Sequence, residues 1–231
     1  DANPGADMSV EHKIDGLSMS ATYKNGKLVK AETRGDGFIG EDITENAKYI
    51  KGLPLTVTNP DTFPDELEVR CEVYLPVDRF LVINKERELN GDKLFANPRN
   101  AAAGLLRTKD VTQMKDAGLE CFVFNLQRTA GDKFTSLDMA ATHLEQLVFL
   151  DIHGFQTVTR YHCKTYEEVA EAIRTIDEDD RPSINYWIDG AVVKANSILV
   201  RDTLGTTGKY PKWAVAFKYP PEEKETTITD I

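Results

Sequence analysis

Residues 17–34 read LSMSATYKNGKLVKAETR and contain two segments separated by the dipeptide Asn25-Gly26. Asn-Gly is the pair that best suits a two-residue type I′ turn, because both central positions of that turn need a positive φ. The flanking segments are therefore predicted to form an antiparallel hairpin. Residues 67–75 alternate apolar and polar side chains, which predicts a further half-buried strand with Glu72 on its polar face. These segments together indicate an antiparallel sheet.

The rest of the chain mixes helical and strand patterns. Helices are predicted at 76–89, 99–106, 136–153 and 165–176, and further strands at 119–126, 188–195 and 213–218. Gly154 should end the third helix, and residues 165–168 form the capping-box pattern at the start of the fourth. Hairpins and helices without regular strand–helix–strand units predict an α+β fold with an antiparallel sheet and flanking helices.

Residues 35–40, GDGFIG, match the G-x-G-x-x-G pattern of dinucleotide-binding folds. Those folds place the pattern between a parallel strand and a crossover helix. Here the preceding segment is the second arm of the predicted hairpin, so we do not interpret these glycines as a Rossmann motif.

The 231-residue chain has a formal net charge of −10. Contacts with phosphates need clustered Lys and Arg, so this charge taken alone argues against a nucleic-acid partner. The net charge is an average over the surface, however, and a local basic groove is compatible with it. No apolar run approaches the ~20 residues that span a bilayer, so no membrane association is expected.

The three cysteines, Cys71, Cys121 and Cys163, form no CxxC pair. We therefore expect reduced cysteines in a cytoplasmic protein, with neither a disulfide framework nor a zinc site. The four histidines, at 12, 143, 153 and 162, show no metal-ligand spacing, and we expect them to be structural or exposed.

Residues 11–16, EHKIDG, place Lys13 at the end of one predicted strand and just before another. Such a lysine would be partly desolvated, and desolvation favours the neutral amine that can act as a nucleophile. Asp15 would share a side of the strand with Lys13 and Glu11, where it could orient the amine or hold a metal. Gly16 would let a ligand approach the backbone closely. A surface lysine on an ordinary strand remains the simpler explanation of this hexapeptide taken alone.

Further segments favour a nucleophilic Lys13 over a surface lysine. EHKIDG resembles the first motif, K-x-D-G, of covalent nucleotidyltransferases, which include ligases and RNA capping enzymes. Five later stretches are similar to NAD-dependent DNA ligases of the bacterial type and follow in the same order: TRGDG with GED (33–42), EVRCEVYLP (68–76), FANPRNAAAGLLR (95–107), IDGAVVK (188–194) and WAVAFKYP (213–220). Ser18 stands where ATP-dependent ligases typically carry Arg, which favours the NAD-dependent branch. The chain thus resembles the adenylation domain of this family, and the fold of the DNA ligase catalytic core is expected.

The resemblance implies three phosphoryl-transfer steps. Lys13 attacks the α-phosphorus of NAD, releases nicotinamide mononucleotide and carries AMP on its side chain. The AMP then passes to the 5′-phosphate of nicked duplex DNA, and the 3′-hydroxyl displaces it to seal the strand. Mg²⁺ is expected as a cofactor that is bound mainly through phosphates, with few protein ligands.

The resemblance also assigns the AMP-binding residues. Lys218 is expected at the α-phosphate, and Arg34 near the ribose and phosphate. Lys194 is expected on the adenine side, where it could pair with Glu11. The remaining expected AMP-binding residues are Glu72, which would accept hydrogen bonds from the ribose hydroxyls, Phe124, which takes the place of a stacking tyrosine, and Ile14.

Four residues keep two interpretations each. Arg99 and Arg107, eight residues apart on a predicted helix, form either a solvated basic stripe or a contact with DNA phosphates. Asp189 is a candidate metal ligand or a turn-capping residue. Trp213 is expected in the core or beside Lys218. A fifth residue, Trp187, replaces an acidic side chain that is common in the family, which puts a local polar contact in doubt.

Residues 1–8 are predicted to be a linker or truncated edge, and residues 9–231 the adenylation domain. We expect the chain to lack the family's helical N-terminal segment and its OB, zinc, helix-hairpin-helix and BRCT parts. It should therefore be a monomer that reacts weakly with NAD and seals nicks poorly by itself. Two other classes stay open at this point: an ATP-using relative such as an RNA ligase, and a catalytically inactive nucleic-acid-binding module.

Overall fold

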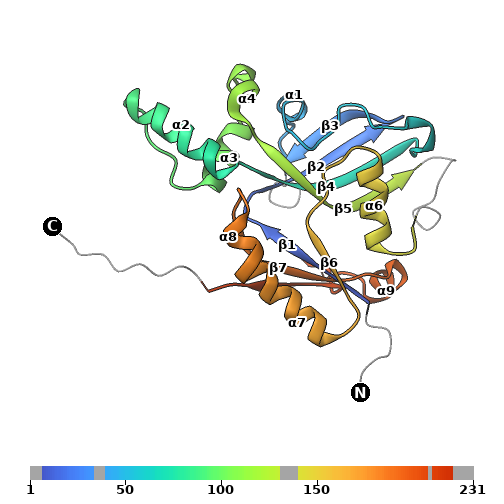
Figure 1. The fold of residues 1–231 in the computed structure, drawn as a ribbon. Coiled ribbons are helices and arrows are strands. Elements are labelled where there is room, and N and C mark those ends of the chain that lie inside the picture. Colours follow the sequence, from blue (N-terminus) through green and yellow to red (C-terminus); the bar gives the residue numbers. More distant parts are fainter. Residues whose placement is uncertain (1–6, 34–39, 131–139, 208–209, 221–231) are drawn as a thin grey trace.

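Two antiparallel four-stranded sheets form the framework of the protein, in the strand orders β3-β2-β4-β5 and β6-β1-β7-β8. The structure is a computed structural model, and it describes residues 7–33, 40–130, 140–207 and 210–220. Figure 1 shows the two sheets one above the other, with helices around them. The α+β class with an antiparallel sheet is confirmed, and the sequence did not show that the strands divide between two sheets.

The first sheet contains β2 (Leu17–Lys24), β3 (Lys27–Thr33), β4 (Glu66–Tyr74) and β5 (Glu120–Ala130). The β2–β3 turn has positive φ angles of 47° at Asn25 and 72° at Gly26, as the type I′ geometry requires. The predicted hairpin is therefore confirmed. The predicted alternation of β4 is also confirmed, because its apolar side chains from Leu67 to Val73 are completely buried.

The second sheet contains β1 (Met8–Ile14), β6 (Arg160–Cys163), β7 (Ile188–Ala195) and β8 (Ala214–Lys218). The chain passes from β1 to β2, and so from one sheet to the other, through Asp15 and Gly16. A Cβ atom on Gly16 would lie 2.2 Å from the carbonyl oxygen of Val73. The missing side chain thus lets the crossing segment pack against β4, and the expected approach of a ligand to Gly16 stays a prediction.

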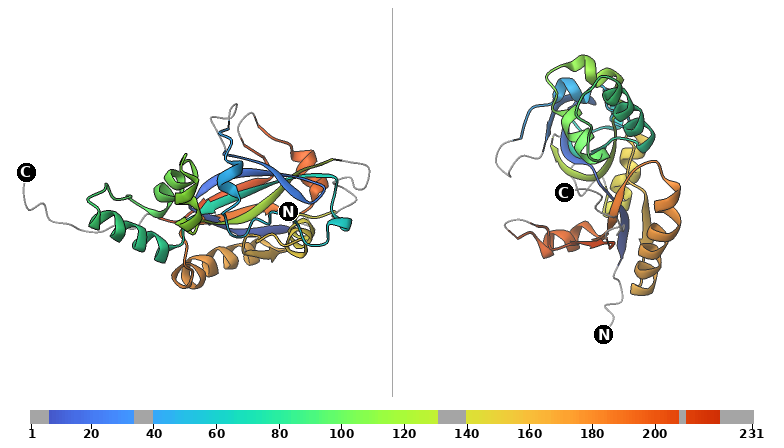
Figure 2. Two further views of the ribbon diagram at one scale, coloured as in Figure 1. Left: turned by 90° about the horizontal axis from the view of Figure 1, so that it is seen from above. Right: turned by 90° about the vertical axis from the view of Figure 1, so that its left-hand side faces the viewer.

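The helices lie at the ends and on the outer sides of the sheets (Figures 1 and 2). They are α1 (Thr44–Ala47), η1 (Pro60–Thr62), α2 (Val77–Leu89), α3 (Pro98–Leu106), α4 (Val111–Ala117), α6 (His143–Ile152), α7 (Tyr166–Thr175), the π-helix η2 (Ile176–Asp180), α8 (Arg181–Ser183) and α9 (Ile198–Leu204). Helices α2, α3 and α4 connect β4 to β5 and form an arm at one end of the molecule. No helix within the described residues is long and apolar enough to cross a membrane.

Two helix starts differ from the prediction. The helix predicted at 136–153 begins only at His143, because Thr142 caps it and forms a full capping box with Glu145. Residues 140–142 are not helical, and residues 136–139 lie outside the described residues. At α7, Thr165 caps the helix as predicted, but the Glu168 carboxylate accepts a hydrogen bond from the backbone of Lys164 rather than of Thr165.

The predicted linker at 1–8 extends too far toward the first strand. Strand β1 begins at Met8, and the Asp7 carboxylate accepts a hydrogen bond of 2.7 Å from the Asn196 side chain. Residues 1–6 lie outside the described part of the chain.

An aromatic cluster forms part of the core against the first sheet. The completely buried ring of Tyr23 from β2 packs edge-on against Phe63 and Phe155, and Phe63 also stacks with Phe149 of α6. Offset and edge-on contacts of this kind add to the burial of apolar area that holds α6 in place.

Candidate active site

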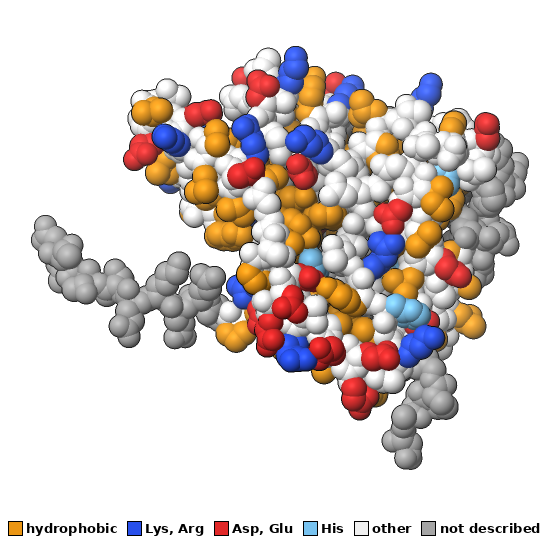
Figure 3. Space-filling view, viewed as in Figure 1, with side chains coloured by type: hydrophobic (Ala, Val, Ile, Leu, Met, Phe, Trp, Pro, Cys, Tyr) orange, Lys and Arg blue, Asp and Glu red, His pale blue; other side chains and the backbone are white. Residues whose placement is uncertain are grey.

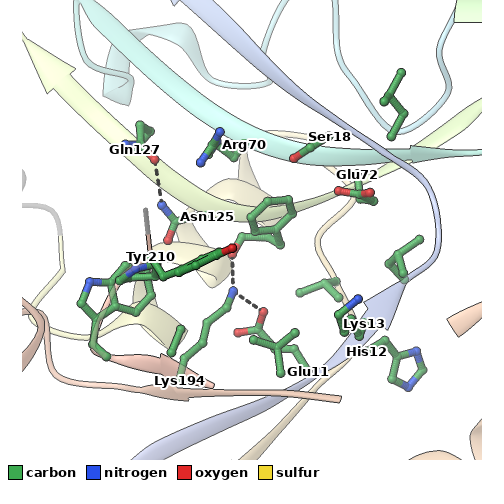
Figure 4. A pocket seen from close by; sticks show the side chains of 18 of the residues that line it. Glu11, His12, Lys13, Ser18, Arg70, Glu72, Asn125, Gln127, Lys194 and Tyr210 are labelled. Atoms are coloured by element: carbon green, nitrogen blue, oxygen red, sulfur yellow. Dashed lines mark hydrogen bonds and ion pairs between the residues drawn. The ribbon is translucent and has the colours of Figure 1, made fainter. Parts of the chain in front are cut away.

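A cavity of about 750 Å³ lies where the two sheets face each other (Figure 4). Its walls come from β1, β2, β4, β5, β7 and the segment between α9 and β8. Six residues assigned to the site from the sequence line it, namely Glu11, Lys13, Ile14, Glu72, Phe124 and Lys194, together with Arg99. Three others, Asp15, Asp189 and Lys218, line a second cavity of about 950 Å³. The predicted residues therefore converge, but on two adjoining hollows.

Lys13 is held at the junction of these hollows by Asp189. The Lys13 Nζ atom donates to Asp189 Oδ1 at 2.6 Å, and the Lys218 Nζ atom lies 3.2 Å from Asp189 Oδ2. The arrangement follows from the register of the sheet, because Gly190 on β7 pairs with Lys13 on one side and with Lys218 on the other. Burial raises the pKa of Asp189, but the two ammonium groups outweigh it and leave the pKa below its ordinary value. One carboxylate thus anchors both lysines.

Asp15 pairs with Arg99, and Lys13 pairs with Asp189, so the expected contact between Asp15 and the amine is not found, while the alternative role of Asp15 as a metal ligand stays a prediction. The β1–β7 register shifts between Lys13 and Ile14, so the alternation of the strand breaks there. The Asp15 backbone N–H donates to the carbonyl of Trp187 at 2.8 Å, and its carboxylate accepts a hydrogen bond of 2.7 Å from Arg99. Asp15 therefore ties the crossing segment to helix α3.

A buried ion pair lies further along the first cavity from Lys13 (Figure 4). The Lys194 Nζ atom donates to Glu11 Oε2 at 2.5 Å and to the carbonyl of Phe124 at 2.8 Å, and it lies 5.2 Å from the centre of the Phe124 ring. The predicted pairing of Glu11 with Lys194 is confirmed. Burial by itself would raise the pKa of Glu11, but Lys194 and His143 outweigh burial and lower the pKa to about 2. Glu11 is thus a fixed negative charge at physiological pH.

Glu72 lies on β4 opposite Ser18 of β2 and points into the cavity near Lys13 (Figure 4). Burial raises the pKa of its carboxyl to about 7, against the opposing influence of Arg99, of a hydrogen bond from Ser18 and of Lys13. The sequence suggested an ionised carboxylate at this position. In the ligand-free protein, the Glu72 carboxyl instead holds its proton more strongly than an exposed glutamate does, because it is buried.

Arg99 and Arg107 do not behave as a single basic stripe. Arg99 is near the start of α3 and turns toward the first cavity, where it pairs with Asp15. Arg107 is the C-cap of α3 rather than part of it, and it pairs with Glu41 at 2.9 Å. Arg34, which was also expected in the site, lies outside the described residues.

The sequence matches a known family over nearly its whole length. Residues 2–222 match the family described as the NAD-dependent DNA ligase adenylation domain. The chain belongs to this family. It is 48% identical over 223 residues to the DNA ligase of Acetivibrio thermocellus and 45% identical over 226 residues to that of Caldicellulosiruptor bescii. These matches cover 96% and 97% of this chain but 32% of each relative, so the adenylation domain spans about a third of the ligases it matches.

A solved structure has the same fold. The adenylation domain superposes on mycobacterial DNA ligase D complexed with ATP and MES with a TM-score of 0.51 and 14% sequence identity. The match covers 94% of this chain and 56% of that chain. At this identity the likeness concerns the fold, and it confirms the expected architecture of a DNA ligase catalytic core.

The candidate metal ligands of the adenylation domain are few among the residues that the structure describes. Within the described residues, no group of three His, Cys, Asp or Glu side chains could hold a metal ion. Both oxygens of Asp189, the candidate ligand, face ammonium groups. Mg²⁺ would therefore depend on oxygen ligands from a bound phosphate.

Sequence reasoning missed several residues of the adenylation domain that shape the site. His143 and Ser9 hydrogen-bond the buried Glu11 carboxylate. His143 is 132 residues away along the chain and left no signal, whereas the alternation of β1 places Ser9 on the same face as Glu11 and could have found it. Trp213 is half-buried and lines the first cavity with its ring centre 4.3 Å from the Arg201 guanidinium, so it lies neither in the core nor on the second cavity that Lys218 lines, and neither expected position is found. The side chain of Trp187 is 46% exposed and lines the second cavity.

Proposed function

We propose that this domain transfers AMP from NAD to Lys13. As part of a longer ligase like its relatives, it would then pass the AMP to the 5′-phosphate of nicked duplex DNA. The observation that carries the proposal is the anchored Lys13 amine at the mouth of a cavity that ends in the Glu11–Lys194 pair. A nucleotide needs both features, because its phosphate must meet the nucleophile while its base is fixed some distance away.

The residues that line the cavity favour one orientation of AMP, with the adenine at the Glu11–Lys194 pair and the phosphate at Lys13. The Phe124 ring offers a stacking surface for adenine, and the Glu11–Lys194 pair beside it offers one acceptor and one donor to the edge of the base. Glu72 lines the same cavity from β4, where it would accept hydrogen bonds from the ribose hydroxyls. The α-phosphate would then lie near Lys13, Lys218 and Arg99, and Arg34 is proposed to join them.

In the first step, the nitrogen of Lys13 forms a bond to the α-phosphorus while the bond from that phosphorus to the bridging oxygen breaks. Nicotinamide mononucleotide leaves with the oxygen and its electron pair. The ammonium must lose a proton before it attacks. Because the pKa of Asp189 is lowered, this carboxylate is suited to orient the amine rather than to retain the proton. Lys218 and Arg99 would stabilise the negative charge that develops on the phosphate oxygens.

The DNA partner is proposed to contact the arm of α2, α3 and α4. Figure 3 shows Lys and Arg side chains interspersed with Asp and Glu over this arm, whereas Asp and Glu predominate over η2 and α8 on the opposite side of the hollow. The net charge of −10 is therefore unevenly distributed. Arg107, at the end of α3, is placed to contact a DNA phosphate if its pairing with Glu41 opens.

The test is intact mass spectrometry after incubation with NAD and Mg²⁺, with and without a helical N-terminal segment of a related ligase supplied in trans. ATP and the Lys13→Ala variant are the controls. We expect one added AMP with NAD but not with ATP, an adduct that increases with the helical segment, and none in the variant. An adduct with ATP would assign the domain to the ATP-using class. Absence of an adduct, together with absence of AMP binding by calorimetry, would contradict the proposal.

A further inference from the structure

Two buried side chains lie behind Glu11 on the side away from Lys194. His143 Nε2 lies 2.6 Å from Glu11 Oε1, and the Ser9 hydroxyl donates to the same oxygen at 2.9 Å. Lys194 occupies the other oxygen, Oε2. All four side chains are at least 94% buried. The carboxylate is therefore held by three donors and cannot rotate without breaking at least one buried hydrogen bond.

The imidazole of His143 acts as a neutral donor. Glu11 can only accept, so the shared hydrogen belongs to Nε2 of His143. Its other nitrogen, Nδ1, is buried and has no hydrogen-bond partner among the described residues. Burial and the charge of Lys194 lower the pKa of His143 to about 4. His143 thus restrains Glu11 without neutralising it, and the Glu11–Lys194 pair keeps one negative and one positive member.

The position of His143 is itself fixed by the second sheet. His143 is the first residue of α6, and its backbone N–H donates to the carbonyl of Asn196, just after β7, at 2.8 Å. The next backbone N–H, of Leu144, donates to the Asn196 side chain at 3.0 Å. The start of α6 is therefore attached to the strand that carries Lys194.

We propose that His143, assisted by Ser9, is a positioning residue that gives this site its selectivity for adenine; the inference rests on the nucleotide site proposed above. Adenine presents a ring-nitrogen acceptor beside an amino donor, which matches the Lys194 donor beside the Glu11 acceptor. Hypoxanthine presents a ring N–H beside a carbonyl oxygen, and so mismatches at both positions. Discrimination then requires that Glu11 keep its oxygen in place rather than rotate to suit the wrong base.

The experiment compares the dissociation constants of AMP and IMP for the intact chain by calorimetry at pH 7.5. In His143→Ala we expect the preference for AMP over IMP to fall by about tenfold, because a hydrogen bond to a buried charge is lost. His143→Gln can supply an N–H to the same Glu11 oxygen and should restore most of the preference. His153→Ala, which removes another buried histidine just after the same helix, should leave the preference unchanged.

Circular dichroism and thermal melting show whether each variant is folded. Should His143→Ala fail to fold, Ser9→Ala removes a donor to the same oxygen with a smaller change in volume, and a smaller loss of preference is expected. An unchanged AMP-to-IMP ratio in the folded histidine variant, or in Ser9→Ala where that variant takes its place, would overturn the inference while leaving the nucleotide site intact. Failure of the unmodified chain to bind AMP would overturn both.

Discussion

At the scale of single residues, one carboxylate organises the proposed reaction centre. Asp189 contacts both Lys13 and Lys218, although the sequence separates it from Lys13 by most of the chain. The sequence motif suggested Asp15 for this role, because regular alternation would place it on the side of Lys13. The β1–β7 register shifts just after Lys13, and Asp189 rather than Asp15 contacts the Lys13 amine. Such a shift depends on long-range strand pairing, which a local sequence pattern does not contain.

We expect Asp189→Asn to slow formation of the lysyl-AMP adduct by roughly 100-fold, because the amine loses the anion that orients it. AMP affinity should stay the same or rise, since two ammonium groups are no longer neutralised. The adduct rate is measured by intact mass spectrometry with NAD and the helical segment in trans. Asp177→Asn is the matched control, because Asp177 lines the same second cavity but pairs with Arg181. Equal rates for Asp189→Asn and the control would contradict this role for Asp189.

The raised pKa of Glu72, about 7, makes nucleotide affinity depend on pH. Ribose hydroxyls donate to the ionised carboxylate, so binding below pH 7 must release a proton from Glu72. AMP affinity should therefore fall up to tenfold for each pH unit below 7 and level off above pH 8. The phosphate of AMP also titrates near pH 6, and comparison with Glu72→Gln removes this common part. Parallel pH profiles from calorimetry for the two proteins would contradict the assignment.

At the scale of elements, local chemistry explains which parts of the fold the sequence predicts. The β2–β3 turn and the helix caps at Thr165 and Gly154 depend on neighbouring residues, and all three are found. Strand β6 was missed because its four residues are too few for their alternation of polar and apolar side chains to stand out. The start of α6 was misplaced although Thr142 and Glu145 carry the capping-box pattern.

The crossing between the sheets gives a prediction about stability. In Gly16→Ala, the added Cβ would meet the Val73 carbonyl oxygen at 2.2 Å, and that oxygen belongs to strand backbone that has little room to move. We expect the free energy of unfolding to fall by about 1–3 kcal/mol, as for other overpacked sites. Gly104→Ala is the control, since its Cβ would meet only the ring of Phe95 at 3.2 Å, and a helical alanine is intrinsically favourable. Urea denaturation followed by circular dichroism measures both variants, and equal stability would show that the crossing segment tolerates a side chain.

At the scale of the whole molecule, the charge distribution matters more than its sum. The net charge of −10 argued against a nucleic-acid partner, whereas the ordered motifs argued for one. The two observations are compatible, because Asp and Glu are concentrated over η2 and α8, whereas the arm of α2, α3 and α4 carries Lys and Arg interspersed with Asp and Glu (Figure 3). Composition could not show this separation, since it depends on where distant segments lie in the folded chain.

Arg107 provides the test of the proposed DNA-binding surface. If it contacts a phosphate, Arg107→Ala should weaken binding of a nicked duplex by about the same factor for any sequence, and should reduce the slope of log affinity against log salt concentration by about 1. Fluorescence anisotropy over a range of salt concentrations gives both quantities. Arg174→Ala is the matched control, because Arg174 is also an exposed arginine in an ion pair, with Glu171 on α7, beside the acidic η2. An equal effect of the two substitutions would mean that total charge, rather than the arm, attracts DNA. A loss of DNA affinity confined to Arg107→Ala would instead assign the phosphate contact to the C-terminal end of α3. The same helix carries Arg99, near its other end, at the proposed reaction centre, so α3 would contact both the DNA and the nucleotide site.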